Sequence, residues 1–168
     1  VTEGWSCADS LVINPHKMLF VPFDFSALYL RDISQLRDLF SLVPEYLRGD
    51  TESSVTNYMD YGVQLGRRFR AIKAWMVWRT LGRAGLAARI REHLRLAQLF
   101  AGWVKDDPQL ELLAPVIMGV VCFAPRCADL GTAERICHEL VAEINSSGRA
   151  YLTLTRLGER SAVRLGLG

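Results

Sequence analysis

The chain has 168 residues, a formal net charge of +2 at pH 7 and a hydrophobic fraction of 50%. This length suits one domain, or one domain and part of another. The nearly balanced charge gives no reason to expect a nucleic-acid partner. The longest uncharged apolar run, 112–124, is shorter than the roughly 18–20 residues that span a bilayer, so we expect no membrane partner either.

The four cysteines, at positions 7, 122, 127 and 137, form no CxxC pair and have no histidine at zinc-finger spacing. We therefore expect reduced thiols and no metal site. The first residues show neither the basic nor the apolar part of a signal peptide, and the chain does not begin with Met. The sequence thus predicts a cytoplasmic protein and a piece cut from a longer chain.

Two apolar runs, 11–13 and 19–21, predict strands that are buried on both faces, and 26–31 predicts a further strand after a turn near 22–24. Lys17 lies between the first two runs, so we expect it on a turn or at a strand edge, beside buried apolar walls. Burial favours the neutral amine, which is a nucleophile able to form a Schiff base with an aldehyde. The alternative is a partly buried lysine that pairs with Asp9 or Asp24.

Residues 32–57 are polar and irregular, which is typical of a functional loop or of a disordered segment. Tyr46 lies in this segment, as a loop anchor or as part of a functional loop. Residues 63–80 then predict a long helix, because apolar residues recur at steps of three and four. Gly66 near its start costs about 1 kcal/mol of helix propensity relative to Ala, so a close backbone approach is expected there.

The rest of the chain predicts a small α+β layer. A second helix covers 86–105 after a turn at 81–85, followed by strands at 110–113 and 116–123. A helix over 132–146, with Thr132 as its N-cap, precedes two strands at 150–155 and 161–167. Arg164 interrupts the last apolar strand, either as a ligand-binding residue or in a structural ion pair.

Several motifs, in this order along the chain, resemble those of the group II pyridoxal-phosphate (PLP) decarboxylases, and above all the aromatic-L-amino-acid decarboxylases. The run from Leu65 to Arg70 is more similar to the aromatic branch than to the glutamate branch. The matching segments are Asn14-Pro15-His16-Lys17, Phe23-Asp24-Phe25-Ser26-Ala27, Pro44-Glu45-Tyr46-Leu47, Leu65-Gly66-Arg67-Arg68-Phe69-Arg70, Trp75-Met76-Val77-Trp78-Arg79, Gly119-Val120-Val121-Cys122-Phe123 and Ala162-Val163-Arg164-Leu165.

This resemblance implies an α/β fold, namely the C-terminal part of a PLP-dependent transferase-like enzyme of the aspartate aminotransferase type (fold type I). Residues 1–72 would end the large PLP-binding domain, and 73–168 would form the small C-terminal α+β domain. It also implies a homodimer with its active site at the subunit interface.

The resemblance implies roles for individual residues. Lys17 would carry PLP as a Schiff base, with Asn14 and His16 beside the cofactor phosphate and His16 also facing the substrate. Tyr46 would protonate the substrate Cα from a mobile loop. The substrate-binding residues would be Phe23, Gly66 and Arg164, with Gly66 also bordering the cofactor site of the neighbouring subunit.

The function implied is decarboxylation of an aromatic L-amino acid to its amine and CO2. Alternatives are a glutamate or other acidic amino acid decarboxylase, an aldehyde-forming relative, or a non-catalytic fragment that acts as a dimerisation module. In the family, the aspartate at the pyridinium nitrogen, the stacking histidine and the main phosphate loop precede the lysine segment. This chain matches none of them, so we expect the 168 residues alone to be inactive.

Overall fold

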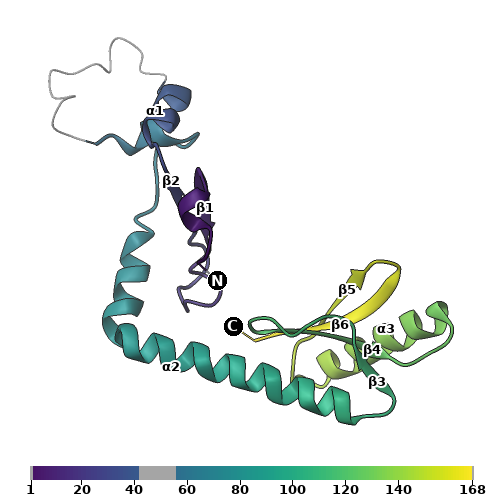
Figure 1. Ribbon diagram of the computed structural model, residues 1–168. Helices are drawn as coiled ribbons and strands as arrows, with labels where there is room; N and C mark the ends of the chain where they lie inside the picture. Colours follow the sequence, from purple (N-terminus) through teal and green to yellow (C-terminus); the bar gives the residue numbers. More distant parts are fainter. Residues whose placement is uncertain (1, 42–55, 168) are drawn as a thin grey trace, which may run out of the picture. The chain divides into compact units, whose positions relative to one another are not determined.

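The computed structural model describes residues 2–41 and 56–167. The chain forms two compact units, Val1–Thr80 and Leu81–Gly168, each of which is described by itself. Figure 1 labels the helices and strands of both units. The predicted domain boundary at residue 72 stays a prediction.

The first unit is built around a two-stranded antiparallel sheet. Strand β1 (Ser10–Ile13) pairs with β2 (Ala27–Leu30), so that Ser10 lies opposite Leu30. Helix α1 (Ser34–Phe40) follows β2, and the unit ends in the first turns of α2 (Ala71–Asp106). Short 3-10 helices lie at Trp5–Cys7 and Tyr58–Tyr61.

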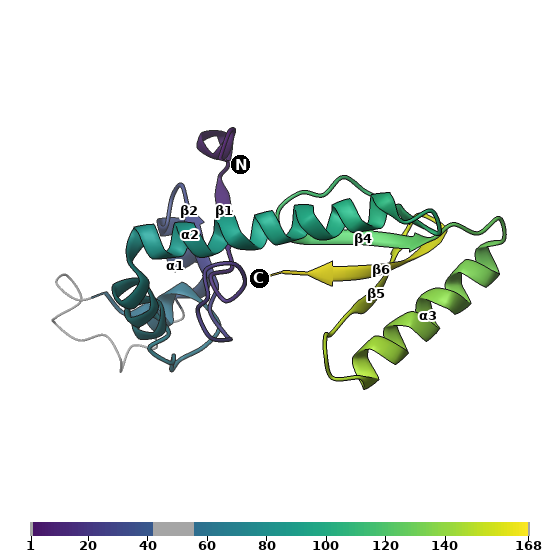
Figure 2. The same cartoon turned by 90° about the horizontal axis from the view of Figure 1, so that it is seen from below.

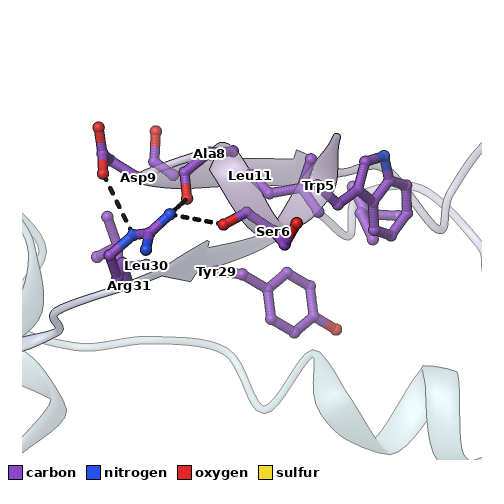
Figure 3. A pocket seen from close by; sticks show the side chains of 10 residues that line it. Trp5, Ser6, Ala8, Asp9, Leu11, Tyr29, Leu30 and Arg31 are labelled. Atoms are coloured by element: carbon purple, nitrogen blue, oxygen red, sulfur yellow. Dashed lines mark hydrogen bonds and ion pairs between the residues drawn. The ribbon is translucent and has the colours of Figure 1, made fainter. Parts of the chain in front are cut away.

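A guanidinium group ties the two ends of this hairpin together. Arg31 donates to the carbonyl oxygens of Ser6 at 2.7 Å and Ala8 at 3.2 Å, and its Nε lies 3.3 Å from the Asp9 carboxylate. Figure 3 shows these contacts beside a hollow of about 550 Å³. The hollow is lined by Trp5, Ser6, Ala8, Asp9, Ser10, Leu11, Ile13, Tyr29, Leu30 and Arg31, so none of the predicted site residues lines it.

Several expectations for the first unit are wrong. Strand β1 alternates between exposed and half-buried residues, since β2 is its only partner within the described residues. Residues 19–21 form no strand, because hydrogen bonds fold 14–21 into turns. Helix α1 lies within the segment predicted to be irregular.

The long helix begins at Ala71 rather than at Val63. Its apolar stripe was expected to be core, but Leu65 is 79% exposed and Phe69 is 73% exposed. Residues 63–70 are not helical, and residues 63–69 are exposed. The stripe therefore lies on the surface of this unit.

Helix α2 is interrupted rather than ended at the predicted turn. Gly82 has φ 62° and ψ 175°, which breaks the helical geometry between two helical stretches. A positive φ is easily reached only by glycine. The predicted turn at 81–85 is thus reduced to a kink at one residue.

The second unit is the predicted α+β layer. Its antiparallel sheet has the order β3-β4-β6-β5, formed by β3 (Leu110–Leu112), β4 (Val120–Pro125), β5 (Thr153–Leu157) and β6 (Arg160–Gly166). Helix α3 (Leu130–Ser146) connects β4 to β5. Its N-cap is Asp129, not Thr132 as predicted, because the Asp129 carboxylate accepts from the Thr132 amide at 2.6 Å.

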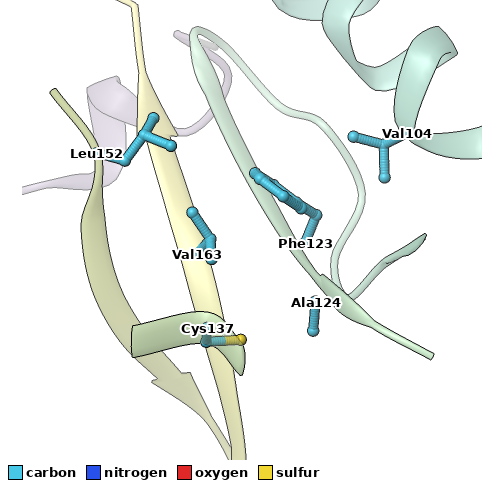
Figure 4. Close-up of a cluster of buried hydrophobic side chains, with 6 residues drawn as sticks. All are labelled: Val104, Phe123, Ala124, Cys137, Leu152 and Val163. Carbon is cyan, nitrogen blue, oxygen red and sulfur yellow. The ribbon is translucent and has the colours of Figure 1, made fainter. Parts of the chain in front are cut away.

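The core of this unit lies between its sheet and its two helical segments. Figure 4 shows Phe123 and Val163 between Val104 of α2 and Cys137 of α3. Ala97, Ala101 and Val104 are all buried, so this face of α2 packs into the core. Figure 2 shows this part of α2 beside β4.

Gly119 is held where no side chain fits. Its carbonyl accepts from the Leu167 amide at 2.7 Å, and an added Cβ would lie 2.1 Å from the Leu167 carbonyl oxygen. Because that obstacle is backbone, we expect Gly119→Ala to destabilise the second unit by about 1–3 kcal/mol. Urea unfolding tests this, with Gly166→Ala as the control, because a Cβ at Gly166 would meet only the flexible Arg164 side chain, at 3.6 Å or more. Equal stability of the two variants would contradict it.

Within residues 2–41 and 56–167, no helix is long and apolar enough to cross a bilayer. Across the same described residues, no group of three or more His, Cys, Asp or Glu side chains lies close enough to hold a metal ion.

Candidate active site

The predicted lysine segment is a tight turn. The Lys17 amide donates to the Asn14 carbonyl at 3.0 Å, which closes a β-turn with Pro15 at its second position. Proline suits this place because its fixed φ pre-forms the turn. A further bond from the Val21 amide to the Pro15 carbonyl, at 3.2 Å, folds the following residues back onto the turn. The turn thus brings Asn14, His16 and Lys17 together.

His16 is fixed by the backbone of Phe25. Its Nδ1 lies 2.5 Å from the Phe25 carbonyl oxygen and 3.2 Å from the Phe25 amide nitrogen. A carbonyl oxygen can only accept, so the shorter contact requires a proton on Nδ1, whereas the longer one would require the opposite tautomer. We assign the proton to Nδ1 because that contact is closer. The neutral ring then presents Nε2 as an acceptor.

Asn14 is oriented by a hydroxyl group. Ser26 donates to the Asn14 Oδ1 at 2.6 Å, which leaves the amide Nδ2 to donate elsewhere. Ser26 lies next to strand β2, so the β1–β2 pairing brings it opposite the turn. The arrangement suits an acceptor such as a phosphate oxygen at Nδ2.

Lys17 itself is exposed, so its predicted burial beside apolar walls is wrong for this chain. The competing interpretation, a structural ion pair with Asp9 or Asp24, is wrong as well. Asp9 pairs with Arg31, and Asp24 pairs with Arg70 at 2.9 Å and with Lys73 at 3.9 Å. Within the described residues the Lys17 amine has no ion pair, so it can react with a bound molecule.

The Asp24 carboxylate is held ionised by the two cations. The hydrogen bond from Arg70 lowers the pKa of Asp24 most, and the positive charges of Arg70 and Lys73 lower it further. A lowered carboxyl pKa gives stability that is present above the unfolded-state pKa and is lost as the pH falls through the folded-state pKa. The Asp24 contribution is therefore complete near neutral pH and disappears in acid.

The lowered pKa of Asp24 predicts a pH dependence of stability that can be tested. We expect Asp24→Asn to lower the Tm of the protein at pH 7, and the difference from wild type to shrink as the pH falls from 5 to 3, around the usual carboxyl pKa of about 4. Thermal unfolding at several pH values measures it. Asp38→Asn, at an exposed position, is the control. A difference that is constant with pH would contradict the pairing.

The other predicted residues fall in three places. The ring of Phe23 lies 5.1 Å from that of His16 in an edge-to-face contact, so the structure brings these two together. Gly66 belongs to the same unit, but nothing lies within 4 Å of its missing Cβ, so the expected close approach does not occur within the described chain. Arg164 is exposed on β6 of the second unit, and Tyr46 lies outside the described residues.

A family model described as "Pyridoxal-dependent decarboxylase conserved domain" matches residues 1–126. The chain belongs to this family.

Similar proteins of the decarboxylase family include the aromatic-L-amino-acid decarboxylase of Rattus norvegicus, which is 37% identical over 96% of this chain and 33% of its own length. A phenylacetaldehyde synthase of Arabidopsis thaliana is 36% identical over 99% of this chain and 35% of its own length. The crystal structure of Oryza sativa TDC with PLP and tryptamine matches 99% of this chain and 36% of its own, with TM-score 0.91 and 34% identity. The chain thus spans about a third of the length of these relatives.

The residues of this decarboxylase chain fit part of a PLP site. An amine without an ion pair, at Lys17, suits covalent attachment of an aldehyde. The Asn14 Nδ2 donor, left over by the Ser26 bond, suits an anionic oxygen. The His16 ring, on the same turn, is oriented by Phe25 and Phe23. Family use of PLP accords with this donor set.

The sequence interpretation missed the residues that support the turn. Ser26 orients Asn14, Phe25 orients His16, and Arg70 with Lys73 binds Asp24. The available signal was charge complementarity between Asp24 and the basic cluster around Arg70.

Proposed function

We propose that the complete protein carrying this chain decarboxylates an aromatic L-amino acid with PLP, releasing the amine and CO2. The single observation that carries the proposal is the Lys17 turn, whose amine has no ion pair in the described chain while Asn14 and His16 are oriented beside it. We further propose that the protein has fold type I, in which residues 1–72 end the large domain and residues 73–168 form the small domain. It would be a cytoplasmic homodimer whose active site is shared between the subunits.

When bound, PLP would supply the electron sink that lets the substrate carboxylate leave as CO2. Lys17 would hold the cofactor, and Asn14 Nδ2 would donate to its phosphate. His16 would accept at Nε2 near the substrate. The Tyr46 hydroxyl would give its proton to the substrate Cα, the step that makes an amine the product.

The exposed ring of Phe23 and the open space at Gly66 favour an aromatic substrate. Phe23 is 84% exposed although its ring edge already touches His16, so its outer face is available for an aromatic ring. Gly66 has open space around it, which would admit a bulky side chain. Arg164 is proposed as a further substrate-binding residue.

Product analysis on the complete protein tests this function. With PLP present, tryptophan, tyrosine, dihydroxyphenylalanine and glutamate are supplied separately, and CO2, amine and aldehyde are measured. The proposal expects CO2 and amine in equal amounts from an aromatic amino acid, with little turnover of glutamate. Turnover of glutamate alone would contradict the aromatic assignment. Absence of any turnover, with no pyridoxyl adduct on Lys17, would favour a dimerisation module.

An aldehyde-forming activity is the second candidate, because a phenylacetaldehyde synthase is 36% identical to this chain. The resemblance favours amine release instead, because it implies that Tyr46 protonates the substrate Cα. In air-saturated buffer, the Tyr46→Phe variant should therefore consume O2 and release aldehyde, ammonia, CO2 and H2O2, where the wild type releases amine and CO2 without using O2. Equal product ratios from the two proteins would remove Tyr46 from the proton-donating role.

A further inference from the structure

Two cations at the start of α2 hold the segment 22–25. Arg70 donates to Oδ2 of Asp24 from Nε at 3.0 Å, and its Nη2 lies 2.9 Å from the same atom. Lys73 donates from Nζ to the carbonyl oxygens of Pro22 at 3.1 Å and Asp24 at 2.9 Å. The backbone is thus bound on both sides of Phe23.

The segment that these cations hold is the one that positions His16. The ring of Phe23 packs edge-to-face on the imidazole, at an interplanar angle of 66°. The carbonyl of Phe25 contacts Nδ1 at 2.5 Å. A shift of this segment would therefore change both the orientation of the imidazole and the tautomer that its neighbours favour.

The positions of Arg70 and Lys73 at the N-terminus of α2 are not explained by the stability of that helix. A helix N-terminus carries a partial positive charge, so basic side chains in the first turn are unfavourable by roughly 0.3–1 kcal/mol. Arg70 precedes the helix and Lys73 lies in its first turn, where there is no acidic residue. The Asp24 carboxylate offsets the repulsion between these cations and the helix dipole. Its ion pairs with Arg70 and Lys73 therefore link the helix to the segment beside His16.

We infer that Arg70, Lys73 and Asp24 form a positioning cluster that fixes the orientation of the His16 ring and its Nδ1-protonated tautomer. Nε2 is thereby kept as the acceptor on the turn that carries Lys17. The consequence for turnover rests on the proposed function, whereas the effect on His16 does not. None of the three residues touches reacting atoms, so they act through His16.

The direct readout is the exchange of the imidazole C2 hydrogen, measured for each histidine by mass spectrometry in the complete protein without PLP. This exchange depends on how an individual ring is held and protonated. In Asp24→Asn and Arg70→Met we expect the rate at His16 to rise about threefold, because the ring is released. His138, exposed on α3, should not change. The matched control is Arg79→Met, an exposed arginine of the same helix.

Kinetics of the PLP-loaded protein give a second readout. We expect kcat/KM to fall about tenfold in each single variant, through misplacement of His16. The kcat/KM of the double variant should be no lower than that of the less active single variant. Both substitutions remove the same Asp24–Arg70 pair, so their effects should not add. Arg70→Lys keeps the charge and should recover most of the loss. If Arg70→Met does not fold, Arg70→Lys and Asp24→Asn decide the question.

Unchanged exchange at His16 in Asp24→Asn, with kcat/KM within about twofold of wild type, would overturn the cluster while leaving the decarboxylase proposal intact. A wild-type protein without decarboxylase activity would sink the proposed function instead. The exchange rate of His16 would then still decide whether the cluster holds this ring.

Discussion

Replacing Lys17 with methionine is expected to abolish decarboxylation by the complete protein. The variant keeps a chain of similar length but lacks the amine that would bond to the PLP aldehyde, so kcat/KM should fall by about 10³-fold or more. The structure gives a reason to choose this amine. Asp9 and Asp24, the two carboxylates that could have engaged it, are paired with Arg31, Arg70 and Lys73.

Covalent trapping measures this effect apart from turnover. The protein is treated with PLP and borohydride, digested and mapped for pyridoxyl peptides. We expect the adduct on Lys17 in wild type and in the control Lys105→Met, at an exposed position on α2. No adduct is expected on the peptide of Lys17→Met. An adduct on Lys73 or Lys105 instead would show that another amine is the attachment point.

Replacing Phe123 with alanine is expected to destabilise the second unit by about 3–5 kcal/mol. Phe123 is 3% exposed and lies in the centre of the core, edge-to-face with Phe100 at 5.5 Å. Its removal leaves a cavity between α2 and the sheet, with Val104 and Val163 at its walls. Such a loss is a large fraction of the stability of a typical domain.

Urea unfolding and amide hydrogen exchange of the β4 and β6 peptides measure this loss. The control is Tyr151→Ala, which removes an aromatic ring that is 79% exposed and should change stability by no more than about 0.5 kcal/mol. Exchange in β4 and β6 should accelerate only in Phe123→Ala. If both variants unfold at the same urea concentration, the assigned core is wrong.

Local patterns predicted the second unit well, because it buries its own apolar faces. The four strands and α3 were predicted from periodicity, although β4 begins at Val120 rather than at 116 and β5 at Thr153 rather than at 150. The N-cap was misplaced because Thr132 and Asp129 are both good capping residues, and only geometry chooses between them. The first unit was predicted less well. Its apolar runs predict burial, but the described part of that unit contains few elements that could provide it.

The roles of the site residues stay predictions, and the groups that support them were not predicted. Lys17 was expected on a turn or at a strand edge, and the structure places it on a turn closed by the Asn14 carbonyl. The Phe25 carbonyl that orients His16 could not be predicted, because a backbone group has no signature in the sequence. The link from Asp24 to Arg70 joins positions far apart in the chain, and opposite charges alone do not identify partners.

The hairpin of β1 and β2 has a practical consequence for purification. Each strand pairs only with the other within the described residues, so the outer rim of each offers unpaired amide and carbonyl groups to any chain that meets it. Val12, Leu28 and Tyr29 are more than half exposed beside these rims. A preparation of the 168 residues alone should therefore lose solubility with rising concentration through strand-to-strand association, and added arginine or a fused soluble partner should slow that loss.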